Sequence, residues 1–372
     1  MDALQNLIKY GQSYWLDNLT RDMITSNDLH TRVTQQGLRG MTSNPSTFNK
    51  TISGSSDYDA HIAQLVRDRQ SVETIYEQLV VQDVQEACDI LRPVYDAADG
   101  QDGFVSLEVS PHLAYDTKGT IEESRRLWRA VDRPNMMIKI PGTSPGVPAI
   151  EQMLYEGINV NITLLFSIAD YETVAHTYIT ALERRVAEGK PVQHVASVAS
   201  FFLSRIDVLV DQLLHQRIRP ENSPGYDARP ARLLGKVAVA NAKLAYQSFK
   251  TIFAEARWKV LALQGAHVQR PLWASTSTKN PDYHDVMYVE PLIGPHTVNT
   301  MPDETINAFA DHGVVAENTV EADLDDAWQI LCDLEAVGID LDCVTWQLQH
   351  EGVQTFIDPF DDLMDTLAQK CS

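Results

Sequence analysis

The sequence has few cations for its length. Its 372 residues include 30 lysines and arginines against 51 aspartates and glutamates, which gives a formal net charge of -21 and a pI of about 4.8. No basic stripe could offset a field of that sign, so we expect no nucleic acid partner. A small phosphorylated ligand is not excluded, because it needs only a few local cations.

Cysteines and long apolar runs are also scarce. The four cysteines show neither CxxC nor Cys/His metal spacing, so we expect free thiols in a reducing compartment and a cytoplasmic protein. No apolar run reaches the length of a membrane span, and the first residues carry acids and lack the apolar core of a secretory signal. We therefore expect no membrane partner. The cysteines are Cys88, Cys332, Cys343 and Cys371.

Short apolar runs alternate with longer segments of helical spacing. Such alternation indicates a parallel sheet with helices on its faces. Eight runs favour a closed (β/α)8 TIM barrel, an α/β fold, over a doubly wound sheet. No GxGxxG or P-loop motif follows any of them. The expected strands are Ser13–Leu16, Leu38–Thr42, Gly103–Val109, Met136–Ile140, Asn159–Leu165, Val195–Ser200, Pro271–Ser275 and Met287–Ile293.

Two stretches look like additions to such a barrel. Residues 216–232 are rich in proline and arginine and indicate a surface loop. Residues after about Pro302 are acidic, with helical patterns over 322–337 and 359–369. We predict one domain over 1–372, with 302–372 as its C-terminal helical part. We also expect truncation after Gly338 to lower stability but to leave the chemistry of the site in place.

One lysine stands alone in an apolar run. Lys139 interrupts the segment Met136–Pro141, of sequence MMIKIP. In a buried strand the ammonium loses water, which favours the neutral amine. A neutral lysine amine is a nucleophile that forms Schiff bases with carbonyl compounds. The structural alternative is a lysine that reaches past the strand end into solvent.

Polar residues end or interrupt most of the expected strands. Catalytic groups of a barrel enzyme lie at the C-terminal ends of its strands. Each of these residues alone fits a helix cap or a hydrogen-bonded core residue. Together they are too many costly polar groups for one interior without a function. They are Asp17, Thr42, Ser43, Asn44, Glu108, Lys139, Asn161, Thr163, Ser200 and Ser275.

Five segments resemble the transaldolase family, in chain order. Residues 41–46 (MTSNPS) are similar to its Thr-Ser-Asn-Pro-Ser signature, and 137–141 (MIKIP) to its Schiff-base lysine motif. Residues 105–117 resemble the strand with its catalytic glutamate, and 157–166 the strand with its asparagine and threonine. The length and the segment 298–302 (VNTMP) resemble the longer bacterial subfamily.

The resemblance implies a class I aldolase-like barrel with extra C-terminal helices. It also implies a transferase of the non-oxidative pentose phosphate pathway. Such an enzyme moves a dihydroxyacetone unit from sedoheptulose 7-phosphate or fructose 6-phosphate to glyceraldehyde 3-phosphate or erythrose 4-phosphate. These small sugar phosphates are the expected partners, and neither a cofactor nor a metal is implied. Both a monomer and a homodimer remain open.

The resemblance also assigns the catalytic roles. Lys139 would form the Schiff base with C2 of the ketose, and Asp17 would act as acid and base at the C4 hydroxyl. Glu108, with a water held by Thr163, would carry the protons for imine formation and hydrolysis.

The resemblance also implies substrate contacts, although not every position matches the family's motif. Asn44 and Asn161 would hold hydroxyls of the three-carbon unit, and Thr42 would be a further substrate-binding residue. Arg205 fits a phosphate ligand within a Ser-x-Phe-x-x-Arg match formed with Ser200 and Phe202, although Phe201 replaces the family's usual proline.

The seventh strand supplies a second phosphate contact. Ser275 fits the family's phosphate serine, but the arginine expected nearby is absent, and Lys279 is the closest cation. Phe202 favours transfer, because related fructose 6-phosphate aldolases tend to have tyrosine there.

Two alternatives to a transaldolase stay open. A fructose 6-phosphate aldolase-like lyase would release free dihydroxyacetone without an acceptor. A non-catalytic sugar-phosphate-binding protein on the same scaffold would be expected to lack Lys139, Glu108 or Asp17, and all three are present.

Overall fold

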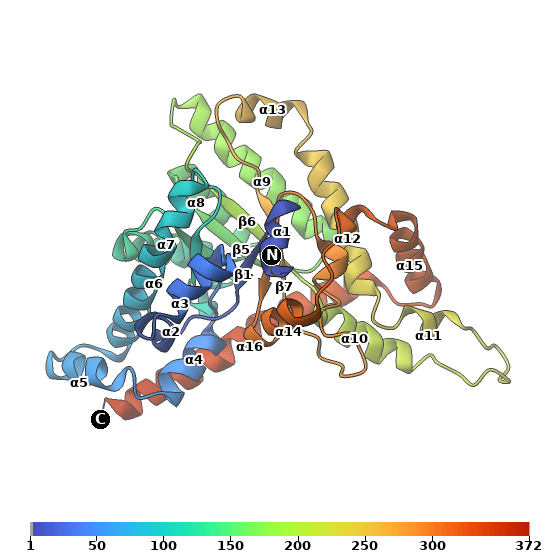
Figure 1. Cartoon of the computed structure of the whole chain (residues 1–372), viewed down its shortest axis with the longest axis horizontal. Coiled ribbons are helices and arrows are strands. Elements are labelled where there is room, and N and C mark those ends of the chain that lie inside the picture. Colours follow the sequence, from blue (N-terminus) through green and yellow to red (C-terminus); the bar gives the residue numbers. More distant parts are fainter. Residues whose placement is uncertain (1–2, 372) are drawn as a thin grey trace.

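Eight parallel strands close into a barrel in the order of the chain, from β1 round to β8. The computed structural model describes residues 3–371, and Figure 1 shows the helices arranged around the strands. The fold is therefore a (β/α)8 TIM barrel, as the alternating pattern predicts. The strands are β1 (Gln12–Leu16), β2 (Gly40–Met41), β3 (Phe104–Glu108), β4 (Met136–Pro141), β5 (Val160–Leu165), β6 (Ser197–Phe202), β7 (Arg270–Ala274) and β8 (Thr297–Met301).

Helices cover the outer surface of the strands. Because both faces of a barrel strand are covered, β4, β5 and β6 are buried along their whole length. The helices between β1 and β6 are α2 (Arg21–Thr25), α3 (Asp28–Thr31), α4 (Pro45–Gly54), α5 (Asp59–Arg67), α6 (Val72–Ala97), α7 (Thr117–Val131), α8 (Gly146–Glu156) and α9 (Ile168–Ala187).

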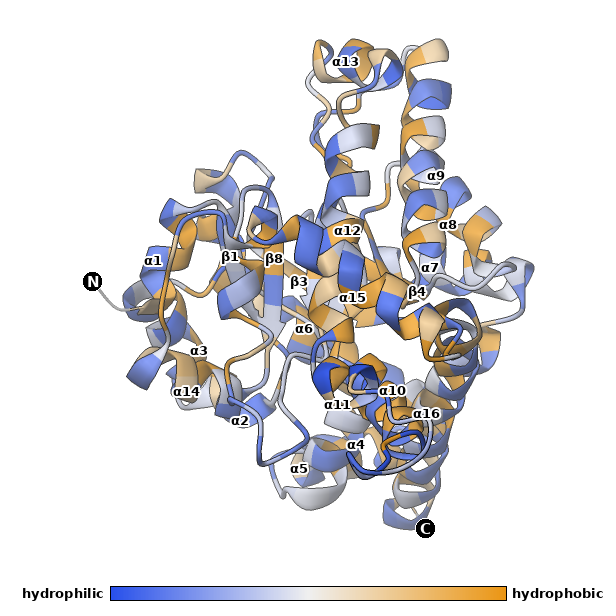
Figure 2. Cartoon of the chain, turned by 90° about the vertical axis from the view of Figure 1, so that its right-hand side faces the viewer, coloured by the Kyte–Doolittle hydropathy of each residue, from blue (hydrophilic) through white to orange (hydrophobic). Residues whose placement is uncertain are grey.

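The remaining helices include an N-terminal helix, α1 (Ala3–Lys9), and those that follow β6. In Figures 1 and 2, α9, α12 and α13 project together on the side away from α16. The later helices are α10 (Ser204–His215), α11 (Arg229–Leu233), α12 (Val237–Ile252), α13 (Ala256–Ala262), α14 (Asp303–His312), α15 (Leu324–Ala336) and α16 (Leu341–Lys370).

Seven of the eight expected strands overlap a strand of the barrel, and the eighth prediction is wrong. The apolar run over 287–293 contains a 3-10 turn (Glu290–Leu292), and the eighth strand is Thr297–Met301. Pro291 has no backbone N–H to donate to a sheet, so Leu292 and Ile293 are buried as loop residues instead. The true strand, TVNTM, was missed because its polar residues weaken the apolar signal.

The loop predicted over 216–232 is confirmed except for its end, where α11 begins at Arg229. The pattern over 322–337 is confirmed as α15. The helical pattern over 359–369 is confirmed as part of α16, which begins earlier, at Leu341, and runs through Pro359 to Lys370. One buried stripe, which includes Phe356, Leu363 and Leu367, continues past Pro359 and holds the helix against the protein.

Helix α16 lies across the barrel end at which the strands terminate. It packs on α4, α6 and α10, and in Figure 1 it runs from the centre of the molecule past α4 to the C-terminus. The four cysteines are free thiols, as expected. Over residues 3–371, none of the helices combines the length and the apolarity that a membrane crossing requires.

Candidate active site

Three predicted residues form a row across neighbouring strands. In the strand register, Glu108 of β3 pairs with Lys139 of β4, and Lys139 pairs with Asn161 of β5. Register partners in parallel strands point to the same face of the sheet. The Lys139 side chain is 6% exposed, and its Nζ lies 3.1 Å from Glu108 Oε2. The same nitrogen donates a hydrogen bond of 3.1 Å to the carbonyl oxygen of Ser43.

The carboxyl group of Glu108 is buried, and no neighbouring group within residues 3–371 donates a hydrogen bond to it. Its contact with Lys139 is an ion pair by distance, yet neither carboxyl oxygen has a hydrogen-bond partner among residues 3–371. Burial raises the pKa of Glu108 above its ordinary value, and the charge of Lys139 opposes that rise. A carboxyl in this environment can take up and release a proton nearer neutral pH.

Thr163 lies beside the row and also keeps an unused polar group. Its Oγ1 is buried and has no hydrogen-bond partner in the described part of the chain. The next residue, Leu164, has a left-handed φ of +61°, and the β5–β6 register shifts between Ile162 and Leu165. Irregularities of this kind re-aim side chains beside active sites. The irregular backbone next to Thr163 therefore interrupts regular sheet pairing at the point where its side chain lines the pocket.

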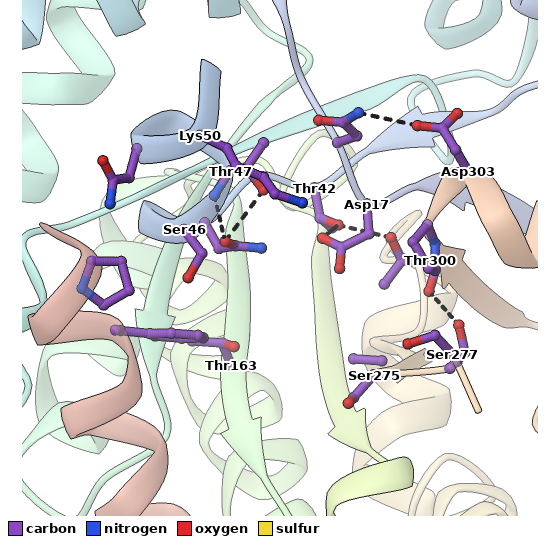
Figure 3. Close-up of a pocket in the computed structure, with 18 of the residues that line it drawn as sticks. Asp17, Thr42, Ser46, Thr47, Lys50, Thr163, Ser275, Ser277, Thr300 and Asp303 are labelled. Atoms are coloured by element: carbon purple, nitrogen blue, oxygen red, sulfur yellow. Dashed lines mark hydrogen bonds between the residues drawn. The ribbon is translucent and has the colours of Figure 1, made fainter. Parts of the chain in front are cut away.

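Asp17 lies at the end of β1 in a chain of hydroxyls. Asp17 Oδ1 accepts a hydrogen bond of 2.8 Å from Thr42 Oγ1, which lies 2.7 Å from Thr300 Oγ1. Figure 3 shows Asp17, Thr42 and Thr300 together at the wall of the pocket. The other carboxylate oxygen, Oδ2, has no hydrogen-bond partner among residues 3–371 and can contact a ligand hydroxyl.

The two predicted asparagines differ in position. Asn44 lines the pocket, and its Oδ1 caps α4 by accepting from the N–H of Thr47 at 3.0 Å. Asn161 is fully buried and is already bonded, donating to Ser106 Oγ at 3.0 Å and accepting from Ser200 Oγ at 2.7 Å. Asn161 therefore holds Ser200 in place and does not itself line the pocket.

The pocket over these residues has a volume of about 1100 Å³ and opens at the barrel mouth. Such a volume suits a sugar phosphate, because ligand pockets typically span about 300–1,000 Å³. Figure 3 shows side chains from several strand ends and from α4 around one space. The predicted residues among the lining are Asp17, Thr42, Asn44, Lys139, Thr163, Ser200, Phe202, Arg205, Ser275 and Lys279.

Arg205 is a second cation of the pocket besides Lys139, and it is partly buried. Its guanidinium lies between two aromatic rings, with Cζ 5.5 Å from the centroid of Phe202 and 5.9 Å from that of Phe356. No ion pair to Arg205 is found within residues 3–371. Burial lowers its pKa, and the charges of Asp17 and Glu108 oppose that fall. A desolvated guanidinium without a carboxylate is well suited to bind a phosphate.

Ser275 and Lys279 extend this side of the pocket. Ser275 adopts a left-handed φ of +56°, and its Oγ lies 2.8 Å from Ser204 Oγ. Lys279 Nζ donates to Ser277 Oγ at 2.5 Å. Both residues line the pocket.

The last helix also contributes to the site, so truncation after Gly338 would remove part of the pocket wall. Phe356 and Pro359 of α16 line the pocket, and Lys139 Nζ lies 5.4 Å from the centroid of the Phe356 ring. Gln349 Nε2 donates to the carbonyl oxygens of Leu164 at 3.2 Å and Gly142 at 3.4 Å. Helix α16 therefore supports the irregular backbone that follows Thr163.

Close packing requires a glycine in this helix. A Cβ atom added at Gly352 would lie 2.9 Å from Leu164 Cδ2, a distance that real Cβ contacts essentially never show. Gly352 thus lets α16 approach the bulge of β5 directly.

Several lining residues besides Phe356 and Pro359 were not predicted from the sequence, among them Ser46, Thr47, Lys50 and Ser277. Ser46, Thr47 and Lys50 lie on one face of α4, and Figure 3 shows them facing the pocket. The available signal was helical spacing after the cap at Asn44: Lys50 follows Thr47 by three residues and Ser46 by four. Ser277 follows Ser275 by two residues. No comparable local pattern marks Phe356, because its place depends on how a distant helix folds back.

Comparisons with known proteins agree with this geometry. The profile of the family described as transaldolase/fructose-6-phosphate aldolase matches residues 14–367. A protein of Nostoc punctiforme named transaldolase 2 is 50% identical over 370 residues, covering 99% of this chain and 97% of the relative. A transaldolase of Trichodesmium erythraeum is 48% identical over 97% of this chain and 95% of the relative. The chain therefore belongs to the transaldolase/fructose-6-phosphate aldolase family.

Proposed function

We propose that this protein is a transaldolase that carries a dihydroxyacetone unit on Lys139. The observation that carries the proposal is a buried lysine amine 3.1 Å from a carboxyl whose oxygens lack hydrogen bonds, at the inner end of a large pocket. Attack of the amine on C2 of a ketose phosphate, with loss of water, gives an iminium. The iminium accepts the electron pair of the C3–C4 bond when that bond breaks.

Glu108 and Asp17 divide the proton transfers between them. Glu108 lies next to Lys139 Nζ and serves carbinolamine formation and dehydration, with a water held between it and Thr163 Oγ1. Asp17 takes the proton from the C4 hydroxyl as the C3–C4 bond breaks and returns it to the acceptor in the second half of the reaction. Two carboxyls in different environments suit these two tasks, because Glu108 is buried and Asp17 is partly exposed.

The phosphate binds at the opposite side of the pocket. Arg205 supplies a bidentate donor, and Ser275 supplies a hydroxyl. Lys279 and Lys50 add positive charge at the rim of the pocket, where the net charge of the protein would otherwise repel an anion. The same contacts serve donor and acceptor in turn, since both carry a terminal phosphate.

Transfer rather than simple cleavage requires that the three-carbon adduct outlive the departure of the first aldose. Phe202 and Phe356 lie close to Arg205, and Phe356 lies over Lys139. These apolar rings limit the water that can reach the adduct. This supports a transaldolase over a lyase, and the protein's place would then be the non-oxidative pentose phosphate pathway.

We also propose that the enzyme works in the cytoplasm. Four free thiols suit a reducing, cytoplasmic compartment. Either a monomer or a homodimer would serve the reaction, because the proposed groups all come from one chain.

The test is an assay of fructose 6-phosphate with and without erythrose 4-phosphate. We expect sedoheptulose 7-phosphate and glyceraldehyde 3-phosphate only when the acceptor is present. Release of free dihydroxyacetone at the same rate without acceptor would identify a lyase. Binding of either sugar phosphate without turnover would identify a non-catalytic protein.

A further inference from the structure

Three side chains outside the pocket converge on one point of the surface. His284 and Asp285 lie in the segment between β7 and β8, and His312 is the last residue of α14. Each offers one ligand atom, and these atoms all lie within 4.8 Å of one another. The proposed reaction uses none of them.

The geometry around His312 resembles that of a metal-binding histidine. His312 Nε2 lies 2.8 Å from Asp285 Oδ1, and its other nitrogen, Nδ1, lies 3.2 Å from Asp311 Oδ2. Metal-bound histidines commonly donate their second ring nitrogen to a carboxylate, which fixes the ring and raises its basicity. The His284 ring stands edge-on to that of His312, with centroids 5.7 Å apart.

We propose that His284, Asp285 and His312 form a surface site for a divalent transition metal of the zinc type. Two imidazoles and one carboxylate are ligands that Zn²⁺ accepts, and water can complete a tetrahedral shell because all three residues are exposed. Calcium and magnesium fit poorly, since both prefer shells of oxygen ligands. To share one ion, His312 Nε2 and Asp285 Oδ1 would move apart from 2.8 Å, and the more distant ligand atoms, now within 4.8 Å, would move closer.

The site would join two walls of the pocket. The segment that carries His284 and Asp285 begins with Ser275 and Lys279, and α14 begins with Asp303 and Glu304, which line the same pocket. A bound ion would link this segment to the far end of α14. An ion that binds only the folded chain stabilises it by mass action. The site does not depend on the reaction proposed above.

A second exposed pair supplies a matched control. His112 Nε2 lies 2.7 Å from Asp361 Oδ1, and both side chains are about half exposed. This pair lacks a third His, Cys, Asp or Glu ligand among residues 3–371. If the cluster around His312 were only an ion pair, the two histidines should respond alike to added metal.

The experiment titrates ZnCl₂ into the untagged full-length chain after removal of metal with a chelator. Calorimetry should show one Zn²⁺ per chain, with affinity reduced roughly tenfold or more in His284→Ala and in His312→Ala. His112→Ala should bind Zn²⁺ as the unaltered chain does. Added Zn²⁺ should raise the melting temperature of the unaltered chain and of His112→Ala but not of the other two variants.

Several outcomes would overturn the site. The unaltered chain could bind no Zn²⁺, or His112→Ala could weaken binding as much as His312→Ala. If His284→Ala bound Zn²⁺ with full affinity, His284 would not be a ligand, and the cluster would be only the His312–Asp285 ion pair. Circular dichroism of each variant without metal checks its fold, and Co²⁺ absorption spectra provide an independent readout: loss of the bound-Co²⁺ signal in Asp285→Asn is expected, and its retention would contradict the carboxylate ligand.

Discussion

Two buried ion pairs lie at opposite ends of the same barrel. At the C-terminal ends of the strands, Lys139 and Glu108 have side-chain exposures of 6% and 4%, with 3.1 Å between Nζ and Oε2. At the N-terminal ends, Arg270 and Asp102 have exposures of 14% and 11%, with 3.6 Å between Nη1 and Oδ2. Burial is therefore similar, and the difference lies in the hydrogen bonds around each pair.

The pair at the N-terminal end is embedded in a hydrogen-bond network. Both oxygens of Asp102 accept hydrogen bonds, one from Ser13 Oγ and one from Trp15 Nε1. Arg270 Nη2 donates to Ser13 Oγ and to the carbonyl oxygen of Thr297, each at 2.7 Å. These contacts join β1, β7 and β8 to the segment before β3, so the pair has a structural task.

The pair at the other end has no such network around its carboxyl. A buried polar group with its partners in place can hold a fold together, whereas one without partners is costly and calls for an explanation. Glu108 and Thr163 both keep buried oxygens without hydrogen bonds in the described chain. Thr163 lines the pocket, and Glu108 lies just behind the lining, in contact with Lys139. The proposed chemistry therefore lies at the end of the barrel where buried strand-end groups lack hydrogen bonds.

The largest effect is expected at the nucleophile. Lys139→Arg should abolish turnover, because a guanidinium stays charged and cannot form an imine. The melting temperature should change little, since the positive charge beside Glu108 is kept. Steady-state assays and thermal melts measure the two effects. Turnover near that of the unaltered chain would remove Lys139 from the mechanism.

The second effect concerns the proton shuttle. Glu108→Gln should lower kcat by roughly 10²–10⁴, the usual contribution of a positioned acid or base. Because burial raises the pKa of Glu108, the rate should fall, as pH drops, at a pH above the ordinary glutamate value of about 4.3. The variant should lose that limb of the pH profile. An unchanged limb would assign it to another group.

The third prediction moves to the opposite end of the barrel. Arg270→Met should lower the free energy of unfolding by about 3 kcal/mol, because it leaves the Asp102 charge buried without its cation. Urea unfolding measures this change. Turnover per folded molecule should stay within a factor of about two to three. A large loss of turnover with unchanged stability would reverse the roles assigned to the two pairs.

The fourth prediction concerns Arg205. Arg205→Ala should raise KM for both phosphorylated substrates more than it lowers kcat, since phosphate binding acts on ground and transition states alike. Loss of a charge-assisted hydrogen bond should weaken binding by about 1.5–3 kcal/mol. Lys279→Ala, at the pocket rim, should have a smaller effect. Equal KM values in the Arg205 variant and the unaltered chain would place the phosphate elsewhere.

The smallest effect is expected from α16. Gln349→Ala should lower kcat by a factor corresponding to about 0.5–1.5 kcal/mol, because it removes the donor to the Leu164 carbonyl behind Thr163. Gln347→Ala is the matched control, since the Gln347 side chain donates to Glu351 on the exposed face of the same helix. Equal rates in the two variants would show that α16 closes the pocket without positioning Thr163.

Most of the barrel could be predicted because its strands are locally distinct. Runs such as Met136–Pro141 are buried on both faces, so they are almost wholly apolar, and a single Lys139 is conspicuous. The eighth strand was missed for the opposite reason: Asn299 and Thr300 are buried polar residues on its two faces and dilute the apolar signal. A more apolar run at 287–293 took its place in the prediction.

The residues of the site also fall into a group that the sequence predicts and a group that it does not. Residues at strand ends could be predicted because the barrel topology itself brings them together. The role of α16 could not, since no local pattern tells that Phe356 reaches Lys139 across more than 200 residues of sequence. The bonds of Asn161 to Ser106 and Ser200 are likewise tertiary. They decide that this amide supports the pocket instead of lining it.

Lys139, at the barrel end where buried groups lack hydrogen bonds, is proposed to form the imine with the substrate. Borohydride reduction in the presence of fructose 6-phosphate, followed by peptide mapping of the full-length chain, tests it most directly. The account predicts one reduced three-carbon adduct per chain, on the peptide that contains Lys139, and none in Lys139→Arg. An adduct on another lysine, or none in a chain that still turns over substrate, would contradict it.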